Sequence, residues 1–324
     1  MAMCVVLLAG AALCVRSLIN ANAIDVGFHT HHIALAKLDP GSLGYTPDKA
    51  KEFYSELLER VEGLPGVISA SYAEFLPLGT AMSSGAVGTQ LGKGMDPSAI
   101  RANFYRVEPG FFRTMGIPML GGRDLTQQEA DSGKPDAVVI NETLARLLWP
   151  GEDPVGKRMA LQGEQQMSQV VGVVKNGKYR TLGEGPLPVV FRGTIPAGRT
   201  LVVRTTGDSR ALLNELTREV PIVDPLMAAT GVQTIEEYMA LPLFPARTLG
   251  WLLGVSGILA LLMTAIGLFG VVAYMVSQRT HEIGVRMALG ARRGDVMKMV
   301  MSQGLWLTAV GLGVGFIAAF GASR

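Results

Sequence analysis

Charged residues and cysteines are both scarce in this chain of 324 residues. Lys, Arg, Asp and Glu together make up 17% of the chain, whereas hydrophobic residues make up 48%, and the mean hydropathy is +0.31. A soluble globular protein usually carries about 25% charged residues, so the composition indicates discrete membrane-spanning segments. The two cysteines, Cys4 and Cys14, both lie in an apolar run at the N-terminus. The rest of the chain therefore has no disulfide, and a hydrophobic core must stabilise it.

Three uncharged runs account for the excess of apolar residues. The run from Leu249 to Val276 exceeds the roughly 20 residues that cross a bilayer core. The runs from Met1 to Val15 and from Leu305 to Phe320 are near the short limit, and each lies against one end of the chain. We predict a partial transmembrane helix at 1–20, a second helix at 247–276 and a third at 304–324, with the membrane region cut short at both ends.

A cleaved secretory signal peptide is the alternative interpretation of the N-terminal run. Ala21, Asn22 and Ala23 could form a cleavage site. Signal peptides carry basic residues before the apolar run, whereas the first charge here, Arg16, follows it. The sequence therefore favours a membrane helix.

The basic residues concentrate between the last two apolar runs. The net charge of +2 does not favour nucleic acid as a partner. Segment 277–303 contains five basic residues, Arg279, Arg286, Arg292, Arg293 and Lys298, against Glu282 and Asp295. Short loops rich in Lys and Arg stay in the cytoplasm, so we expect this segment to be cytoplasmic and in contact with lipid headgroups. The large segment 21–246 then lies outside the membrane.

Two strand–helix–strand units are predicted within segment 21–246. Thr46 and Pro47 are typical of a helix start, and an apolar stripe including Phe53 and Leu57 continues towards Gly63. Extended runs at 33–38 and 67–75 flank this helix. The pattern repeats with a strand at 201–203, a helix that Ser209 caps and extended chain near 230–232. The fold class is α+β, with two strand–helix–strand halves joined in space, plus membrane-spanning α-helices.

A β-rich subdomain is predicted between the two halves. Strands are expected at 138–140 and 170–174, and a short helix is expected to follow Asn141 and to end near Trp149 and Pro150. Residues 80–97 are rich in small side chains and predict a loop.

No set of residues in the sequence predicts an active site. Gly151 to Arg158 fits the spacing of a phosphate-binding loop, but Arg158 replaces the hydroxyl residue that would hold the metal. His29, His31 and His32 could bind zinc, although a solvated linker fits three clustered histidines better. Glu236 and Glu237 are interpreted as a solvated helix face. We therefore predict no catalytic residue, no cofactor site and no metal site.

The basic segment carries the most specific signal. The apolar residues Ile283, Met287 and Leu289, with Glu282 and Arg286 one turn apart, predict a short amphipathic helix that ends at Gly290. Such a helix could fix the membrane topology, or it could dock onto another protein. Its periodicity does not decide between the two.

Segment 277–291, SQRTHEIGVRMALGA, resembles the cytoplasmic signature of the FtsX/MacB family of ABC transporter permeases. The outer segment resembles the periplasmic core domain of that family, in motifs such as LPGV at 64–67, PGFF at 109–112 and VVGVV at 170–174. The resemblance covers nearly the whole chain and is nearest to predicted permeases of the acidobacterial type. It implies four membrane helices, one before the periplasmic domain and three after it. The last of these four is absent from this chain.

The resemblance also implies a function and partners. The chain would be a permease subunit in the inner membrane, without ATPase activity of its own, that works as a homodimer or a paired permease. A separate ABC ATPase would bind a coupling helix, and ATP hydrolysis would move the periplasmic domain, which could contact a periplasmic partner. The residues implied at this interface are Arg279, Glu282, Ile283, Arg286, Met287, Leu289 and Gly290.

Two other functions remain open from the sequence. The chain could be a membrane-anchored periplasmic binding or sensing protein that contacts no ATPase, or a nonfunctional permease fragment. No residue of the outer segment selects a transported substrate.

Overall fold

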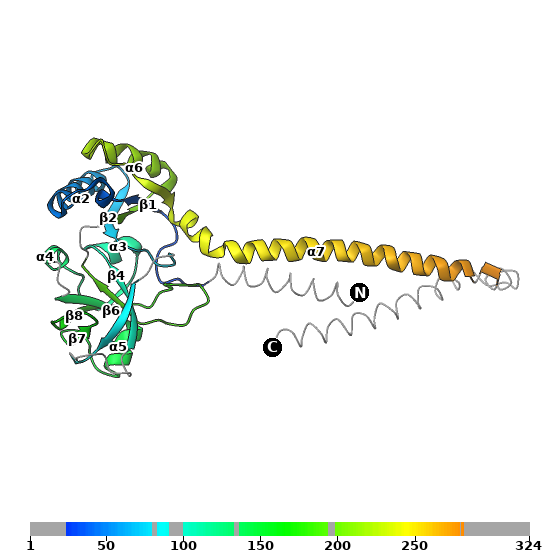
Figure 1. Ribbon diagram of the computed structural model, residues 1–324, viewed down its shortest axis with the longest axis horizontal. Coiled ribbons are helices and arrows are strands. Elements are labelled where there is room, and N and C mark those ends of the chain that lie inside the picture. Colours follow the sequence, from blue (N-terminus) through cyan, green and yellow to red (C-terminus); the bar gives the residue numbers. More distant parts are fainter. Residues whose placement is uncertain are drawn as a thin grey trace. The chain divides into compact units, whose positions relative to one another are not determined.

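The computed structural model describes residues 24–79, 83–90, 100–132, 136–193, 198–278 and 280–281. Residues Ile24–Pro242 form one compact unit, here called the outer domain. It contains two sheets and several helices (Figure 1).

The first sheet has four antiparallel strands in the order β11-β1-β10-β2. These strands are β1 (Ile33–Leu38), β2 (Val67–Ala73), β10 (Arg199–Thr205) and β11 (Thr230–Thr234). Helices α2 (Pro47–Glu62) and α6 (Ser209–Val223) cover one face of the sheet (Figure 1). The two predicted strand–helix–strand halves are therefore confirmed, and they interlock because β10 lies between β1 and β2.

Local sequence signals explain where these helices begin. The Thr46 hydroxyl accepts a hydrogen bond from the Lys49 amide, and Pro47 occupies the first helical turn, as predicted. The predicted cap of α6 is wrong by one residue. Asp208 caps the helix by accepting from the Arg210 amide, and Ser209 is the first helical residue. A carboxylate is the stronger acceptor because it also complements the positive end of the helix.

The second sheet lies in the inserted segment and has seven strands in the order β5-β8-β6-β9-β4-β3-β7. Since β7 also pairs with β8, six of the strands close into a ring, and β5 adds to β8 beside β7. The strands are β3 (Ser83–Gly88), β4 (Ile100–Arg106), β5 (Met119–Gly122), β6 (Ala137–Asn141), β7 (Arg158–Leu161), β8 (Ser168–Val174) and β9 (Val189–Arg192).

Short helices complete this inserted subdomain. They are α3 (Phe111–Met115), α4 (Gln127–Asp131) and α5 (Glu142–Leu148). A 3-10 turn, η1 (Pro40–Leu43), lies outside this subdomain, between β1 and α2. The predicted helix after Asn141 is confirmed as α5, with the Asn141 side chain as its cap. The prediction of a loop over 80–97 is wrong for Ser83–Gly88, which form β3 and pair with β4. Residues 80–82 and 91–97 lie outside the described residues.

A hydrophobic core joins the two sheets. Leu35 and Val202, from the face of the first sheet opposite α2 and α6, pack in one buried cluster with Phe111, Met115 and Phe191 of the inserted subdomain. Separate clusters fill the space under α2 and α6 and the interior of the inserted subdomain. Because one core spans both parts, the outer domain is a single packed body.

Helix α7 (Ile235–Gln278) follows β11 directly and contains the uncharged run from Leu249 to Val276. In the portion of the chain that the structure describes, no helix meets the length and apolarity needed to span a membrane. The three membrane helices stay predictions, and those at 1–20 and 304–324 fall outside the described residues.

Candidate functional site

The residues predicted to contact an ATPase fall outside the described part of the chain. This holds for all seven of them: Arg279, Glu282, Ile283, Arg286, Met287, Leu289 and Gly290. Their role stays a prediction.

The segment with phosphate-loop spacing folds differently from a phosphate-binding loop. Such loops lead into a helix whose N-terminal amides face the phosphate, whereas Gly156 and Lys157 lead into strand β7. The Lys157 ammonium pairs with the Glu152 carboxylate and is therefore already neutralised by its own loop. The geometry offers an anion neither a helix N-terminus nor a free lysine.

The three clustered histidines bind to different parts of the outer domain. The His29 amide donates to the Met115 carbonyl at 2.7 Å, His31 Nδ1 lies 3.0 Å from Glu236 Oε1, and His32 Nδ1 lies 2.8 Å from the Gly207 carbonyl. Partial burial lowers the pKa of His29, and the nearby Arg204 adds to the effect. No group of three metal-ligating side chains converges within the described ranges. All three histidines are exposed, as a solvated linker predicts, and His31 and His32 also attach this segment to the domain.

Glu236 and Glu237 are both exposed at the start of α7, as predicted for a solvated helix face, and they also make structural contacts. The Thr234 amide donates to Glu237 Oε2 at 3.2 Å, and the Glu237 amide donates to the Thr234 hydroxyl at 3.3 Å. These reciprocal bonds form a capping box at the start of α7. The pair Glu236–His31 adds a contact from the first turn of this helix to the segment before β1.

A buried ion pair lies between the first sheet and the inserted subdomain. Arg199, the first residue of β10, places Nη1 2.8 Å from Oε1 of Glu108, which follows β4, and both side chains are only 6% exposed. The guanidinium carbon lies 4.5 Å from the ring centre of Tyr54 and 5.9 Å from that of Tyr72. Arg199 thus has an anion and two aromatic faces as neighbours.

Residues of α4 and α2 extend this cluster towards solvent. The Gln127 side-chain amide donates to Glu108 Oε2 at 3.2 Å and to Asp131 Oδ1 at 3.1 Å. Asp131 in turn lies 2.7 Å from Lys51 Nζ of α2. The chain of contacts from Arg199 to Lys51 therefore crosses twice between the first half of the domain and the inserted subdomain.

Burial dominates the electrostatics of Glu108. Loss of water raises the pKa of its carboxyl, and the attraction of Arg199 opposes that rise without cancelling it. A buried pair of this kind is costly to form and costly to break. Glu108 and Arg199 are far apart in sequence and give no local signal, so sequence reasoning missed the pair. The one available signal was that each is a single charged residue beside a strand of largely apolar residues.

A small pocket opens beside α5. It has a volume of about 230 Å³, and Leu120, Ala145, Val155 and Val173 supply most of its apolar wall. Arg146 and Glu142 also line it and pair with each other at 3.0 Å. These two charges neutralise each other, and the Asp153 carboxylate, which also lines the pocket, accepts a hydrogen bond from the Val155 amide at 2.9 Å.

Two family models match the chain. The MacB-like periplasmic core domain matches residues 3–223, and the FtsX-like permease C-terminal region matches residues 254–324. The second match contains all seven residues predicted to contact an ATPase.

The chain is similar to several curated proteins. It is 27% identical over 236 residues to the macrolide export ATP-binding/permease protein MacB of Hahella chejuensis, a match that covers 69% of this chain and 35% of that protein. It is 25% identical over 234 residues to the probable syringafactin export ATP-binding/permease protein SyfD of Pseudomonas syringae pv. tomato, covering 68% and 35%. The chain spans about a third of the length of these relatives, whose names combine ATP-binding and permease.

Among solved structures, the periplasmic region of MacB from Actinobacillus actinomycetemcomitans aligns with a TM-score of 0.43 and 14% identity, over 68% of this chain and 95% of that one. The extracellular domain of the transporter YknZ from Gram-positive bacteria aligns with a TM-score of 0.37. The assignment rests on the family models and not on these alignments. Since the first model covers more than half of the sequence, the chain belongs to the MacB-like periplasmic core domain family, with an FtsX-like permease region on its C-terminal side.

Proposed function

We propose that the chain is the permease subunit of an ABC-type exporter or mechanotransmission complex in the inner membrane. The observation that carries the proposal is the FtsX-like match over residues 254–324, which includes the basic signature around Glu282 and Arg286. A separate ABC ATPase docks on this signature from the cytoplasm. Its cycle of ATP binding and hydrolysis moves the helices, and the helices move the outer domain in the periplasm.

The described outer domain suits the role of a moved part. The Glu108–Arg199 ion pair and the capping box of Glu237 both form contacts between elements of the domain itself. One hydrophobic core spans both of its sheets. A body packed in this way moves as a unit when one end is displaced, because packed interiors deform little. A homodimer or a paired permease supplies the second half of the complex.

The test exchanges the charges of the signature and measures ATPase binding. In the variant Glu282→Arg with Arg286→Glu, the net charge of segment 277–303 is unchanged, so the membrane orientation set by basic residues is preserved. The complementary contacts with the ATPase are reversed, and like charges then face each other. We expect the tagged variant to lose co-purification of an ABC ATPase encoded beside its gene.

The matched control exchanges Asp295 and Lys298, which lie in the same segment but outside the signature. This variant should retain the ATPase. Protease resistance of the outer domain checks that both variants are folded. ATPase recovery that is equal in the wild type, the signature variant and the control would contradict the coupling role. It would favour an anchored periplasmic binding protein instead.

A further inference from the structure

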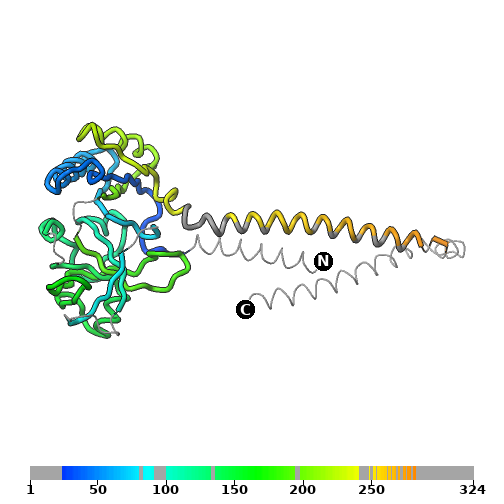
Figure 2. The backbone as a smooth tube through the Cα atoms, viewed as in Figure 1, coloured from blue at the N-terminus to red at the C-terminus, as the bar shows by residue number. Residues whose placement is uncertain are grey.

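Two segments link the outer domain to the predicted membrane helices; the first lies against one loop, and the second reaches that loop through residues 76–79. The first is the segment 24–32, here called the lead, which precedes β1. The second is the first turns of α7, residues 235–239, here called the root. The loop is residues 175–188, between β8 and β9. Figure 2 shows the lead in dark blue close to the yellow start of α7, and the contact His31–Glu236 joins them at 3.0 Å.

The lead is bound to the first part of this loop. The Lys178 amide donates to the Val26 carbonyl at 2.9 Å, and the side chains of Val26 and Phe28 are buried in the core that joins the two sheets. Gly27 has φ +81°, and a Cβ there would lie 2.5 Å from the Asn176 carbonyl oxygen. Only glycine allows the backbone to approach the loop this closely.

The root contacts the same core from the other end of the chain. Ile235 is buried, and Tyr238 and Met239 pack against the cluster that contains Tyr179 of the loop. The Tyr238 hydroxyl donates to the Leu76 carbonyl at 3.4 Å, and the nearby Leu78 amide donates to the Tyr179 carbonyl at 2.8 Å. Burial raises the pKa of Tyr238 to about 12.

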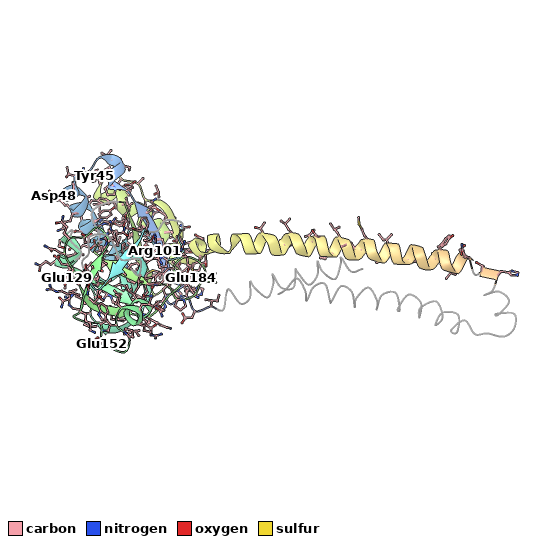
Figure 3. The ribbon with its side chains drawn as sticks, turned by 60° about the horizontal axis from the view of Figure 1, so that its bottom comes forward. Tyr45, Asp48, Arg101, Glu129, Glu152 and Glu184 are labelled. Carbon is pink, nitrogen blue, oxygen red and sulfur yellow. The ribbon has the colours of Figure 1, made fainter. Side chains whose placement is uncertain are left out.

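The loop itself is held by carboxylate and amide side chains. Glu184 accepts from three consecutive amides, those of Tyr179 at 2.6 Å, Arg180 at 3.0 Å and Thr181 at 2.9 Å. At its other end, Asn176 Oδ1 accepts from the side chain of Asn141 and the amide of Thr143, at the junction of β6 and α5. A loop with so many internal bonds to a charged acceptor is rigid despite having no regular secondary structure. Figure 3 places Glu184 on the side of the domain where α7 begins, and Tyr45 and Asp48 on the far side.

We propose that loop 175–188 is a clamp that fixes the lead directly, and the root through residues 76–79, to the inserted subdomain, with Glu184 and Asn176 as its positioning residues. Displacement of either membrane-linked end then moves the inserted subdomain directly, and the loop absorbs none of it. This inference rests on the proposed function only in that the ends transmit a force; the clamp itself is a property of the outer domain.

The test is hydrogen exchange on the full chain in detergent. In the wild type, the amides of Lys178, Tyr179 and Leu78 should exchange at least about a hundredfold slower than in an unstructured peptide, as strand amides do. Exchange within about tenfold of an unstructured peptide would overturn the clamp, whatever the variants do.

The variant Glu184→Gln then tests whether the loop holds both ends. The amide side chain has one acceptor oxygen in place of two and turns its NH₂ group towards backbone donors. Exchange should rise about tenfold at 26–29 and at 235–239 together, because the lost bonds are charge-assisted. Faster exchange in the loop alone would refute the clamp.

The control Glu152→Gln changes a carboxylate in a different loop, one that pairs with Lys157 far from the clamp, and it should leave exchange at both ends unchanged. The Glu184→Gln variant should still co-purify with the ATPase because its cytoplasmic segment is untouched. The clamp and the proposed coupling interface can therefore fail separately.

Discussion

Breaking the ion pair between Arg199 and Glu108 should destabilise the outer domain strongly. The variant Arg199→Met keeps an unbranched apolar side chain but leaves the Glu108 carboxylate buried without its cation. Removing one partner of a buried pair costs about 3 to 5 kcal/mol. For a domain of roughly 200 residues, about 2 to 4 °C are lost per kcal/mol. We therefore expect the melting temperature of the outer domain to fall by about 6 to 20 °C.

The double variant Glu108→Gln with Arg199→Met should recover most of that loss, since no charge remains buried. The exposed pair Arg146–Glu142 provides the control. Arg146 is 74% exposed, and Arg146→Met should cost no more than about 0.5 kcal/mol. Thermal unfolding of the full chain in detergent, followed by circular dichroism, measures all four proteins.

The pH dependence of this deficit gives a second check on the same reasoning. Burial already raises the pKa of Glu108 in the folded protein, and removal of Arg199 should raise it further. When the folded pKa of a carboxyl lies above its unfolded pKa, the protonated form favours the folded state. Its ionisation therefore lowers the free energy of unfolding as the pH rises towards and through the folded pKa. The deficit of Arg199→Met should therefore shrink when the pH is lowered from 7 towards 5. A deficit independent of pH, or one equal to that of Arg146→Met, would refute the role of the buried charge.

Three further predictions concern local contacts. Gly116→Ala should destabilise the domain by at least about 1 kcal/mol, since φ is +68° and the new Cβ would lie 1.8 Å from a ring carbon of His29; the added substitution His29→Ala should recover part of this in urea unfolding. Thr126→Ala removes half of a capping box and should cost about 1 kcal/mol by the same measurement. Hydrogen bonds to Arg123 and Thr126 lower the pKa of Glu129 from 4.5 to about 2. The Glu129 carboxylate therefore stabilises the fold above pH 4.5, and this stabilisation is lost as the pH falls towards 2. In acid unfolding, the variant Glu129→Gln should not show this loss of stability between pH 4.5 and 2.

Helices with local signals could be predicted closely from the sequence. The start of α2 follows from Thr46 and Pro47, and its buried face follows from the spacing of Ala50, Phe53 and Leu57. These features act within one or two helical turns, so no knowledge of the rest of the fold is needed.

Features that depend on distant partners could not be predicted. Strand β3, SSGAVG, has a composition that usually indicates a loop, and it is a strand because β4 and β7 supply its hydrogen bonds. The ring closure by β7 and β8 and the pair Glu108–Arg199 are likewise set by the packed fold. The predicted ATPase contacts were inferred from a sequence motif, and testing them requires the ATPase that is proposed to bind there.

The strand order of the first sheet has a consequence for how the protein is made. Strands β1 and β2 are not neighbours, because β10 lies between them and bonds to both. At roughly 5 to 20 residues per second, β10 leaves the ribosome about ten to thirty seconds after β1. The inserted subdomain can complete its own ring only when β9 emerges, shortly before β10, and throughout the interval β1 and β2 have no strand to pair with. Nascent chains stalled before residue 199 should therefore present two unpaired apolar strands, the stage at which newly made chains are most exposed to aggregation and most dependent on chaperones.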